Sequence, residues 1–390
     1  MAKQPNIRFK GFTEEWKEKT VEEVSIRLDN LRIPIAASLR VAGDTPYYGA
    51  NGIQDYVEGY THDGENILIA EDGASDTDVY PVRITRGKIW VNNHAHVLRG
   101  INGVMSNPFL LYALLKTDFS KILVGGTRHK LTTKALNSTI ISFTPDEKEQ
   151  KAITQTLSLF DTIISQRETE LEKLKNIKRG LLEKLFPKDG QTIPAIRFKG
   201  FDENWEPKIL GNEIEETGTK NRNNLPLESY SITNEAGFIP QNEKFENGGY
   251  VTDADKTMYT IVPPQSFAYN PARINVGSIG YYNGSKDVIV SSLYIVFKTS
   301  EAIHDDFLMA WFKSDIFNHL IYTLQEGGVR QYFFYDKMVQ CPILLPKTPE
   351  QEKIAKLVNS LNKTISLRER QLTLLKHTKQ ALLEQMFVNE

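Results

Sequence analysis

The stretch 149–186, EQKAITQTLSLFDTIISQRETELEKLKNIKRGLLEKLF, is repeated without a gap at 350–387 as EQEKIAKLVNSLNKTISLRERQLTLLKHTKQALLEQMF. Apolar residues recur in both stretches at steps of three and four residues, and no proline interrupts them. This spacing predicts two long amphipathic helices, each with the apolar seam of a coiled coil. The expected seam residues are Leu157, Ile164, Leu171, Leu174 and Leu181 in the first stretch and Val358, Ile365, Leu372, Leu375 and Leu382 in the second.

Both helices are expected to begin at a Thr-Pro pair. Thr144-Pro145-Asp146-Glu147 and Thr348-Pro349-Glu350-Gln351 resemble capping boxes, with Thr as the N-cap and Pro at the first helical position. The predicted helices therefore cover residues 145–186 and 349–387. Because neither apolar seam can remain exposed to water, the two helices should pair, and the chain between them favours an antiparallel coiled coil.

The repeat extends to the start of the chain. The sequence IRFKGF occurs at 7–12 and again at 196–201, and a tryptophan follows each copy at the same distance, Trp16 and Trp205. We call these two segments, residues 7–16 and 196–205, the openers. Their aromatic residues are expected to pack on the domain that follows and so fix the start of each copy, since buried aromatic residues usually do so. An alternative is that they anchor a partner protein.

Each copy also contains short β-branched and aromatic runs separated by Gly, Asn and Asp, followed by a short helical pattern. The expected fold class is mixed α+β: a tandem duplication of an α/β domain plus a long helix. The expected domains cover residues 1–144 and 196–348, and the linker between the first helix and the second domain covers 187–195. The strand order cannot be deduced from the pattern.

The composition excludes several classes of protein. The chain has 390 residues and a formal net charge of −2, so a nucleic-acid partner would require a local basic surface. Its single cysteine, Cys341, excludes an intramolecular disulfide and a cysteine-rich zinc site. The N-terminal MAKQPNIRFK has no signal-peptide core, and no apolar run approaches the ~20 residues of a membrane helix. A cytoplasmic protein without a membrane partner is expected.

These motifs, repeated in the same order, resemble the specificity (S) subunit of type I restriction–modification systems. The resemblance implies two target-recognition domains, each recognising one half of an asymmetric bipartite site in double-stranded DNA. It implies that the two helices set the gap between the half-sites and dock two methyltransferase (M) subunits, which restriction (R) subunits join. It also implies no catalytic centre and no cofactor in this chain, with S-adenosylmethionine, Mg and ATP bound by the partner subunits.

Two other classes of function compete with this interpretation. A self-contained adenine methyltransferase needs a glycine-rich cofactor turn and an Asn/Asp-Pro-Pro-aromatic strip, and Asn270-Pro271-Ala272-Arg273 has only the first half of that strip. A nuclease could use Pro145-Asp146 with Glu149 and Lys151, but these residues lie beside the expected capping box. A scaffold protein that does not bind DNA is the third alternative.

The Gly-Gly loops are the leading candidates for DNA contacts. Glycine lets the backbone approach a phosphate, Arg can donate two hydrogen bonds to guanine, and Gln can pair with adenine. The candidates are Arg128, His129, Lys130 and Lys134 in the first copy and Arg330, Gln331 and Tyr332 in the second.

Polar residues at the ends of the strand-like runs form a second set of candidates. In WVNNHAHVL, a strand would place Asn92, His94 and His96 on one face. A His-x-His metal site there lacks a third ligand, so packing is the favoured role of the histidines and no metal site is predicted. The matching loops after a strand, AEDGASD and YNPARINVGS, supply further candidates. The candidates from these segments are Asn92, Asn93, Asp72, Arg273, Asn275 and Ser278.

Overall fold

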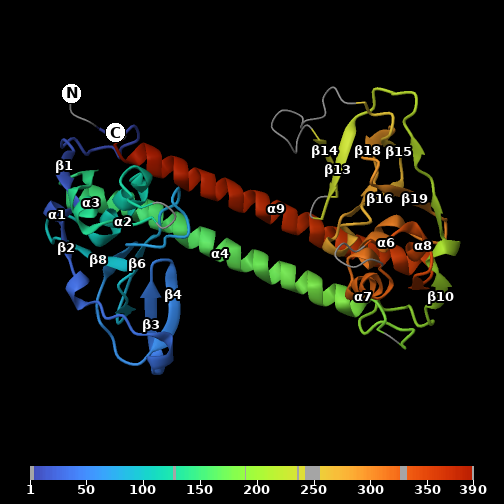
Figure 1. The fold of residues 1–390 in the computed structure, drawn as a ribbon, viewed down its shortest axis with the longest axis horizontal. Coiled ribbons are helices and arrows are strands. Elements are labelled where there is room, and N and C mark those ends of the chain that lie inside the picture. The colour runs from blue at the N-terminus through green and yellow to red at the C-terminus, as the bar shows by residue number, and fades with distance from the viewer. Residues whose placement is uncertain are drawn as a thin grey trace. The chain divides into compact units, whose positions relative to one another are not determined.

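The computed structural model describes residues 4–125, 129–188, 190–234, 237–241, 255–325 and 332–388. The chain divides into two compact units: Met1–Glu168 with Arg370–Glu390, and Thr169–Glu369. Each unit contains an α/β domain and a part of both long helices, α4 (Glu147–Leu185) and α9 (Thr348–Met386) (Figure 1). The predicted tandem arrangement of mixed α/β domains and long helices is confirmed.

The starts of the two long helices differ from the predicted capping boxes. Asp146, not Thr144, caps α4, because its Oδ1 accepts hydrogen bonds from the backbone nitrogens of Lys148 at 2.7 Å and Glu149 at 3.3 Å. In α9, Thr348 is already helical, and the carbonyl oxygen of the preceding Lys347 accepts from the backbone nitrogens of Glu350 and Gln351 in the first turn. The prediction of Thr caps was therefore wrong.

Within each unit the two helices pair in antiparallel directions, as predicted. In the first unit, Lys376 lies 2.6 Å from Glu168 and Lys379 lies 2.5 Å from Asp161, so residue numbers rise along one helix as they fall along the other. In the second unit, Lys175 lies 2.9 Å from Glu369. All ten predicted seam residues are buried or half-buried, with Leu157, Leu171, Val358 and Ile365 in the buried class.

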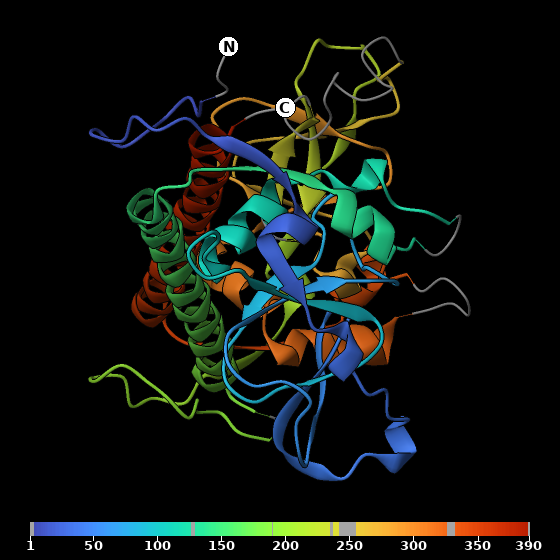
Figure 2. The same cartoon turned by 90° about the vertical axis from the view of Figure 1, so that its left-hand side faces the viewer.

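In the described part of the first unit, which faces the viewer in Figure 2, the strands form two main sheets and one short pair. The four-stranded antiparallel sheet has the order β2 (Ser25–Arg27), β8 (Ala95–Gly100), β5 (Asn66–Ala70), β6 (Val82–Thr85). The three-stranded sheet has the order β4 (Gly52–Val57), β3 (Ala42–Gly49), β7 (Trp90–Val91), and β3 and β7 are parallel. Strand β1 (Lys17–Thr20) pairs with β9 (Ile140–Phe143), and the helices are α1 (Val21–Val24), α2 (Asn107–Lys116) and α3 (Thr133–Ser138).

Among the described residues, the second unit repeats the four-stranded sheet and the short strand pair, but its other sheet has five strands where that of the first unit has three. Its antiparallel sheet has the order β11 (Ile214–Glu216), β19 (Ile295–Thr299), β16 (Ser266–Tyr269), β17 (Ile279–Tyr282). The other sheet has the order β12 (Thr219–Lys220), β15 (Thr260–Val262), β18 (Val288–Val290), β13 (Ser229–Thr233), β14 (Gly237–Pro240), again with one parallel pair, β13 and β18. Strand β10 (Glu206–Ile209) pairs with β20 (Pro342–Leu345), and the helices are α6 (Asp305–Phe312), α7 (Asp315–Leu324) and α8 (Tyr335–Met338).

The core of each unit includes the C-terminal end of a long helix. In the first unit, Phe387 at the end of α9 packs against Trp16 and Phe109, with ring centroids 5.9 and 5.0 Å apart. In the second unit, Phe186 at the end of α4 packs in the same way on Trp205 and Phe307. The predicted pinning role of the two opener tryptophans is confirmed.

A buried ion pair joins the opener of each unit to the start of its long helix. Arg8 Nε lies 2.6 Å and Nη2 2.9 Å from the two carboxylate oxygens of Glu149, whose side chain is fully buried. Arg197 and Glu350 form the same bidentate pair at 2.7 and 2.8 Å. Glu149 is therefore engaged in holding the start of the helix to the opener.

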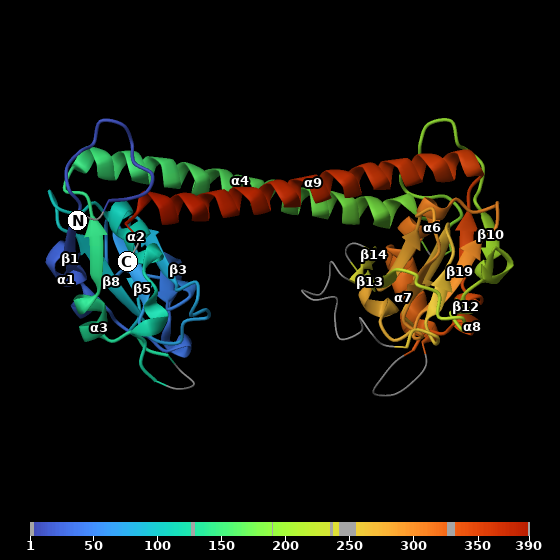
Figure 3. The ribbon, with the colours of Figure 1, turned by 90° about the horizontal axis from the view of Figure 1, so that it is seen from above.

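The glutamine that follows each buried glutamate makes a further contact at the helix start, and this contact is the same in both units. The side-chain amide of Gln150 donates to Val104 O at 2.8 Å and to Thr144 O at 3.0 Å, and that of Gln351 donates to Ala302 O and Pro346 O, both at 2.9 Å. The Glu-Gln pair thus fixes the start of each long helix on its own domain. Figure 3 shows the ribbons of α4 and α9. Among the described residues, no helix has both the length and the apolar character needed to span a membrane.

Candidate nucleic-acid interface

In the first unit, the loop after β5 meets two other segments at the end of the four-stranded sheet where β5 stops and β8 starts. This end of the strands is called the edge of the sheet below. The backbone nitrogen of Glu71 donates to His94 O at 2.9 Å, and that of Leu131 donates to Glu71 O at 2.7 Å. The β5 loop, the turn between β7 and β8, and the segment that follows the Gly-Gly loop are therefore held together. Three groups of predicted contact residues, far apart in sequence, share this edge.

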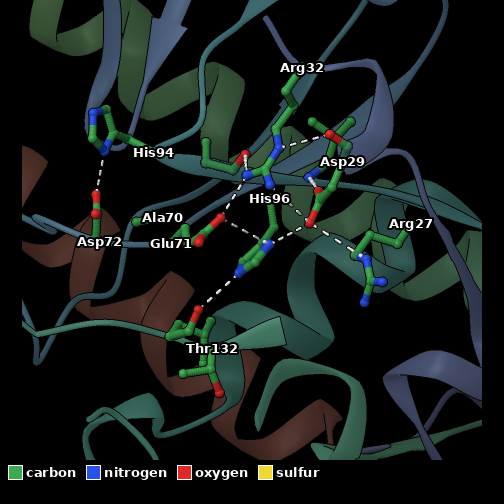
Figure 4. Close-up of polar contacts among 12 residues, drawn as sticks. Arg27, Asp29, Arg32, Ala70, Glu71, Asp72, His94, His96 and Thr132 are labelled. Carbon is green, nitrogen blue, oxygen red and sulfur yellow. Dashed lines mark hydrogen bonds and ion pairs between the residues drawn. The ribbon is translucent and has the colours of Figure 1, made fainter. Parts of the chain in front are cut away.

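Charged side chains fill the space beneath this edge (Figure 4). Arg32 Nη1 lies 2.7 Å from Glu71 Oε2, and Lys130 Nζ lies 3.0 Å from Glu71 Oε1. Burial alone would raise the pKa of Glu71, but the hydrogen bonds from Arg32 and Lys130 outweigh it and hold the pKa below its usual value. Glu71 therefore stays ionised. Its negative charge partly neutralises Lys130, which the sequence predicts as a DNA contact.

His96 lies at the centre of the same network and is fully buried. Its Nδ1 is 2.7 Å from Asp29 Oδ2 and its Nε2 is 2.9 Å from Leu131 O. Asp29, Glu71 and His96 each offer one possible metal-ligand atom, and these three atoms lie within 4.8 Å of one another, a spacing that could hold a metal ion. However, a backbone carbonyl only accepts, so Nε2 carries a proton, while Arg32 occupies the space between the carboxylates. The network fits a packed polar core better than a metal centre.

The predicted strand through Asn92, His94 and His96 is interrupted. Strand β7 ends at Val91 and β8 begins at Ala95, because Asn92 forms a turn in which its Oδ1 accepts from the backbone nitrogen of His94 at 2.8 Å. Asn92 is only 4% exposed, so the prediction that it reaches a base edge is not supported. Asn93 is exposed at the tip of the turn, and Asp72 is half-buried with His94 Nδ1 at 2.5 Å.

The second unit brings together the equivalent segments. The backbone nitrogen of Phe333 donates to Pro271 O at 3.0 Å, as Leu131 does to Glu71 in the first unit. Arg273 and Asn275 are exposed on this loop. Ser278, by contrast, is 5% exposed and its hydroxyl donates to Ile232 O at 3.2 Å, so it holds the loop and the prediction of a DNA contact is corrected.

Lys313 supports the same loop from beneath. Its Nζ donates to Gly277 O at 2.9 Å and to Asn234 O at 3.2 Å. Burial, together with the charge of nearby Lys178, lowers the pKa of Lys313 to about 8. The loop that carries Arg273 and Asn275 is therefore fixed by hydrogen bonds from a side chain outside it.

The Gly-Gly loops themselves are only partly described. Arg128, Arg330 and Gln331 lie outside the described residues. His129 and Lys134 are exposed, and Tyr332 is half-buried with its ring stacked on Phe334.

Asp29, Arg32, Lys313 and Phe334 were not among the residues predicted from the sequence. The first three act through long-range contacts that leave no local pattern. Phe334 could have been found by aligning it with Thr132 in the repeat, because an exposed aromatic residue there breaks the similarity of the two copies.

The comparisons with known proteins agree on one family. A family model described as the type I restriction modification DNA specificity domain matches residues 13–176. A putative type I restriction enzyme specificity subunit of Haemophilus influenzae is 46% identical over 135 residues, 35% of this chain and 34% of that protein. In the matched segments, this chain is similar to type I restriction specificity subunits. The sequence match spans only about a third of the Haemophilus protein's length.

Three further comparisons extend over most of the chain. The type I restriction enzyme MjaVIII specificity subunit of Methanocaldococcus jannaschii is 22% identical over 328 residues, 78% of this chain and 74% of that protein. The crystal structure of the S subunit of a type I restriction–modification system from M. genitalium has a TM-score of 0.68 at 15% identity, covering 99% of this chain and all of that chain. A structure from work on complex assembly in a type I system has a TM-score of 0.52 at 13% identity and covers 96% and 98% of the two chains. The two structures establish a shared fold.

Proposed function

We propose that this chain is the DNA sequence-specificity subunit of a type I restriction–modification complex. Each unit recognises one part of an asymmetric bipartite target in double-stranded DNA. The chain positions two methyltransferase subunits, with which restriction subunits associate. It acts in the cytoplasm, where this DNA is accessible.

One observation carries the proposal. Both units use a four-stranded antiparallel sheet and the same backbone hydrogen bond, Leu131 to Glu71 and Phe333 to Pro271, to join two loops at one sheet edge. The side chains on these loops differ between the units. A common scaffold with different loops suits two readers of two different sequences.

We also propose that the chain is not catalytic and binds no cofactor of its own. Glu149, the central acid of the alternative nuclease motif, is buried and paired with Arg8, so it supports the helix start rather than metal-ion chemistry. S-adenosylmethionine, Mg and ATP belong to the partner subunits in this proposal. The self-contained methyltransferase and the scaffold without DNA binding remain the alternatives that the experiment must exclude.

The experiment compares the chain alone with the chain bound to its methyltransferase subunit. The isolated chain should neither bind S-adenosylmethionine in calorimetry nor transfer labelled methyl groups to plasmid DNA. With the methyltransferase subunit, it should direct methylation to a single bipartite motif, detected by sequencing modified bases. Methyl transfer by the isolated chain would contradict the proposal, as would methylation by the complex without a sequence preference.

A further inference from the structure

The segment that follows the Gly-Gly loop has the same backbone structure in both units but different exposed side chains. Leu131 and Phe333 are the buried anchors, and each donates its backbone nitrogen to the neighbouring loop. The short helices α3 and α8 follow directly. The residues on either side of the anchor are Lys130 and Thr132 in the first unit and Tyr332 and Phe334 in the second.

In the second unit these two side chains form an aromatic pair. The rings of Tyr332 and Phe334 are stacked, with centroids 5.4 Å apart and planes inclined by 4°. Phe334 remains 47% exposed, although buried phenylalanines are abundant elsewhere in this unit. The pair thus holds an apolar surface in a fixed orientation at the edge where the loops meet.

Phe334 also occupies a position that disfavours phenylalanine. It is the N-cap of α8 and provides no capping hydrogen bond, whereas Thr132 in the first unit caps α3 by accepting from Ala135 N at 3.2 Å. Ser, Thr, Asp and Asn are preferred at this position because their side chains satisfy an unpaired backbone donor. A residue that breaks the local rule and exposes apolar surface is expected where function requires it.

The surroundings of the pair identify the kind of partner. The hydrogen bond from Phe333 to Pro271 places the pair beside the loop that carries exposed Arg273 and Asn275. Lys313 adds a cation beneath that loop, and exposed Asp336 is the nearby acid on α8. A guanidinium and an amide next to a rigid apolar surface suit a duplex, whose phosphates are anionic and whose base edges include the apolar thymine methyl group.

We propose that Tyr332 and Phe334 form an apolar base-contacting surface that discriminates between base pairs at one position of the second half-site. This inference rests on the proposed function and assigns a contact within it. The first unit has Lys130 and Thr132 in the same place, so the two units differ here in the chemistry with which they contact DNA.

The test uses Phe334→Thr, which gives the second unit the capping residue of the first. The full chain is bound to its methyltransferase subunit, and affinity is measured by fluorescence anisotropy on duplexes in which each base pair of the target is replaced in turn. The variant should lose about tenfold in discrimination at one position of the second half-site and keep the preferences of the first half-site. Its thermal stability should be equal or higher, because the helix gains a cap.

Two further variants and the unaltered complex make the result decisive. Tyr322→Ala removes another aromatic ring of this unit, 76% exposed on α7, and should leave every preference unchanged. Tyr332→Ala should relax the same position as Phe334→Thr. If Phe334→Thr keeps the full base preferences, or weakens only the binding of the methyltransferase subunit, the inference is overturned while the proposed function stands. If the unaltered complex has no sequence preference at all, the proposed function itself has failed.

Discussion

Replacing Arg8 by alanine should lower the free energy of unfolding of the first unit by about 3–5 kcal/mol, because it leaves a buried carboxylate without its partner. The side chain of Glu149 is fully buried, and that of Arg8 is 12% exposed. The two hydrogen bonds of the pair, 2.6 and 2.9 Å long, would both be lost. Urea unfolding monitored by circular dichroism, with hydrogen exchange to identify the unit affected, measures the effect.

Two controls separate the buried pair from an ordinary ion pair. Lys347→Ala breaks the ion pair between Lys347 and Glu203, whose side chains are 71% and 68% exposed. This change should lower the free energy of unfolding by at most about 1 kcal/mol. The double variant Arg8→Met with Glu149→Met should recover much of the lost stability, since no charge then remains buried. An Arg8→Ala chain as stable as the Lys347→Ala chain would contradict the assigned role of the pair.

Phe387→Ala should have an effect of similar size, about 3–5 kcal/mol, and this effect should fall on the first unit. Phe387 lies near the end of the chain but is only 3% exposed, with its ring against Trp16 and Phe109. Hydrogen exchange should therefore speed up in the strands of the first unit, including β5, and change little in β16 of the second.

Leu374→Ala is the matched control on the same helix, because Leu374 is 67% exposed. It should change the free energy of unfolding by less than about 0.5 kcal/mol. A Phe387→Ala chain in which only the second unit loses protection would refute the assignment of the end of α9 to the core of the first unit.

The long helices could be predicted closely because their signal is local and periodic. Apolar residues at every third or fourth position indicate a helix whatever lies around it, and the predicted bounds differ from α4 and α9 by no more than two residues. The helix caps could not be predicted as well. Thr144 and Asp146 are both good N-caps, but the hydroxyl of Thr144 donates to the carboxylate of Glu149, which pairs with Arg8 from a distant part of the sequence.

The candidate site shows the same limit. The sequence placed Asp72 and Arg273 correctly on the loops that follow a strand, because polar residues after apolar runs are usually in turns. It misjudged Asn92 and Ser278, since a polar side chain that holds a turn resembles one that contacts a ligand until its hydrogen-bond partner is known. The network of Asp29, Arg32 and His96 joins segments from three parts of the chain and has no sequence signature.

The unit boundaries also depend on tertiary structure. The sequence predicts domains at 1–144 and 196–348, whereas the compact units extend into both helices and divide near Glu168 and Glu369. This division reflects which side chains pack together: the end of α9 on the first domain and the end of α4 on the second. Periodicity gives the length of a helix but not the core that its end joins.

The central claim is that two units of common fold read two independent parts of one DNA target. A chimaera tests it most directly: residues 196–348 are replaced by the equivalent domain of a specificity subunit with a different target, and both helices are retained. The chimaera is expressed with the methyltransferase subunit, and the methylated motif is read by sequencing modified bases. Only the second part of the motif should change, with the first part and the gap length intact. A motif that changes in both parts, or loses its fixed gap, would contradict it.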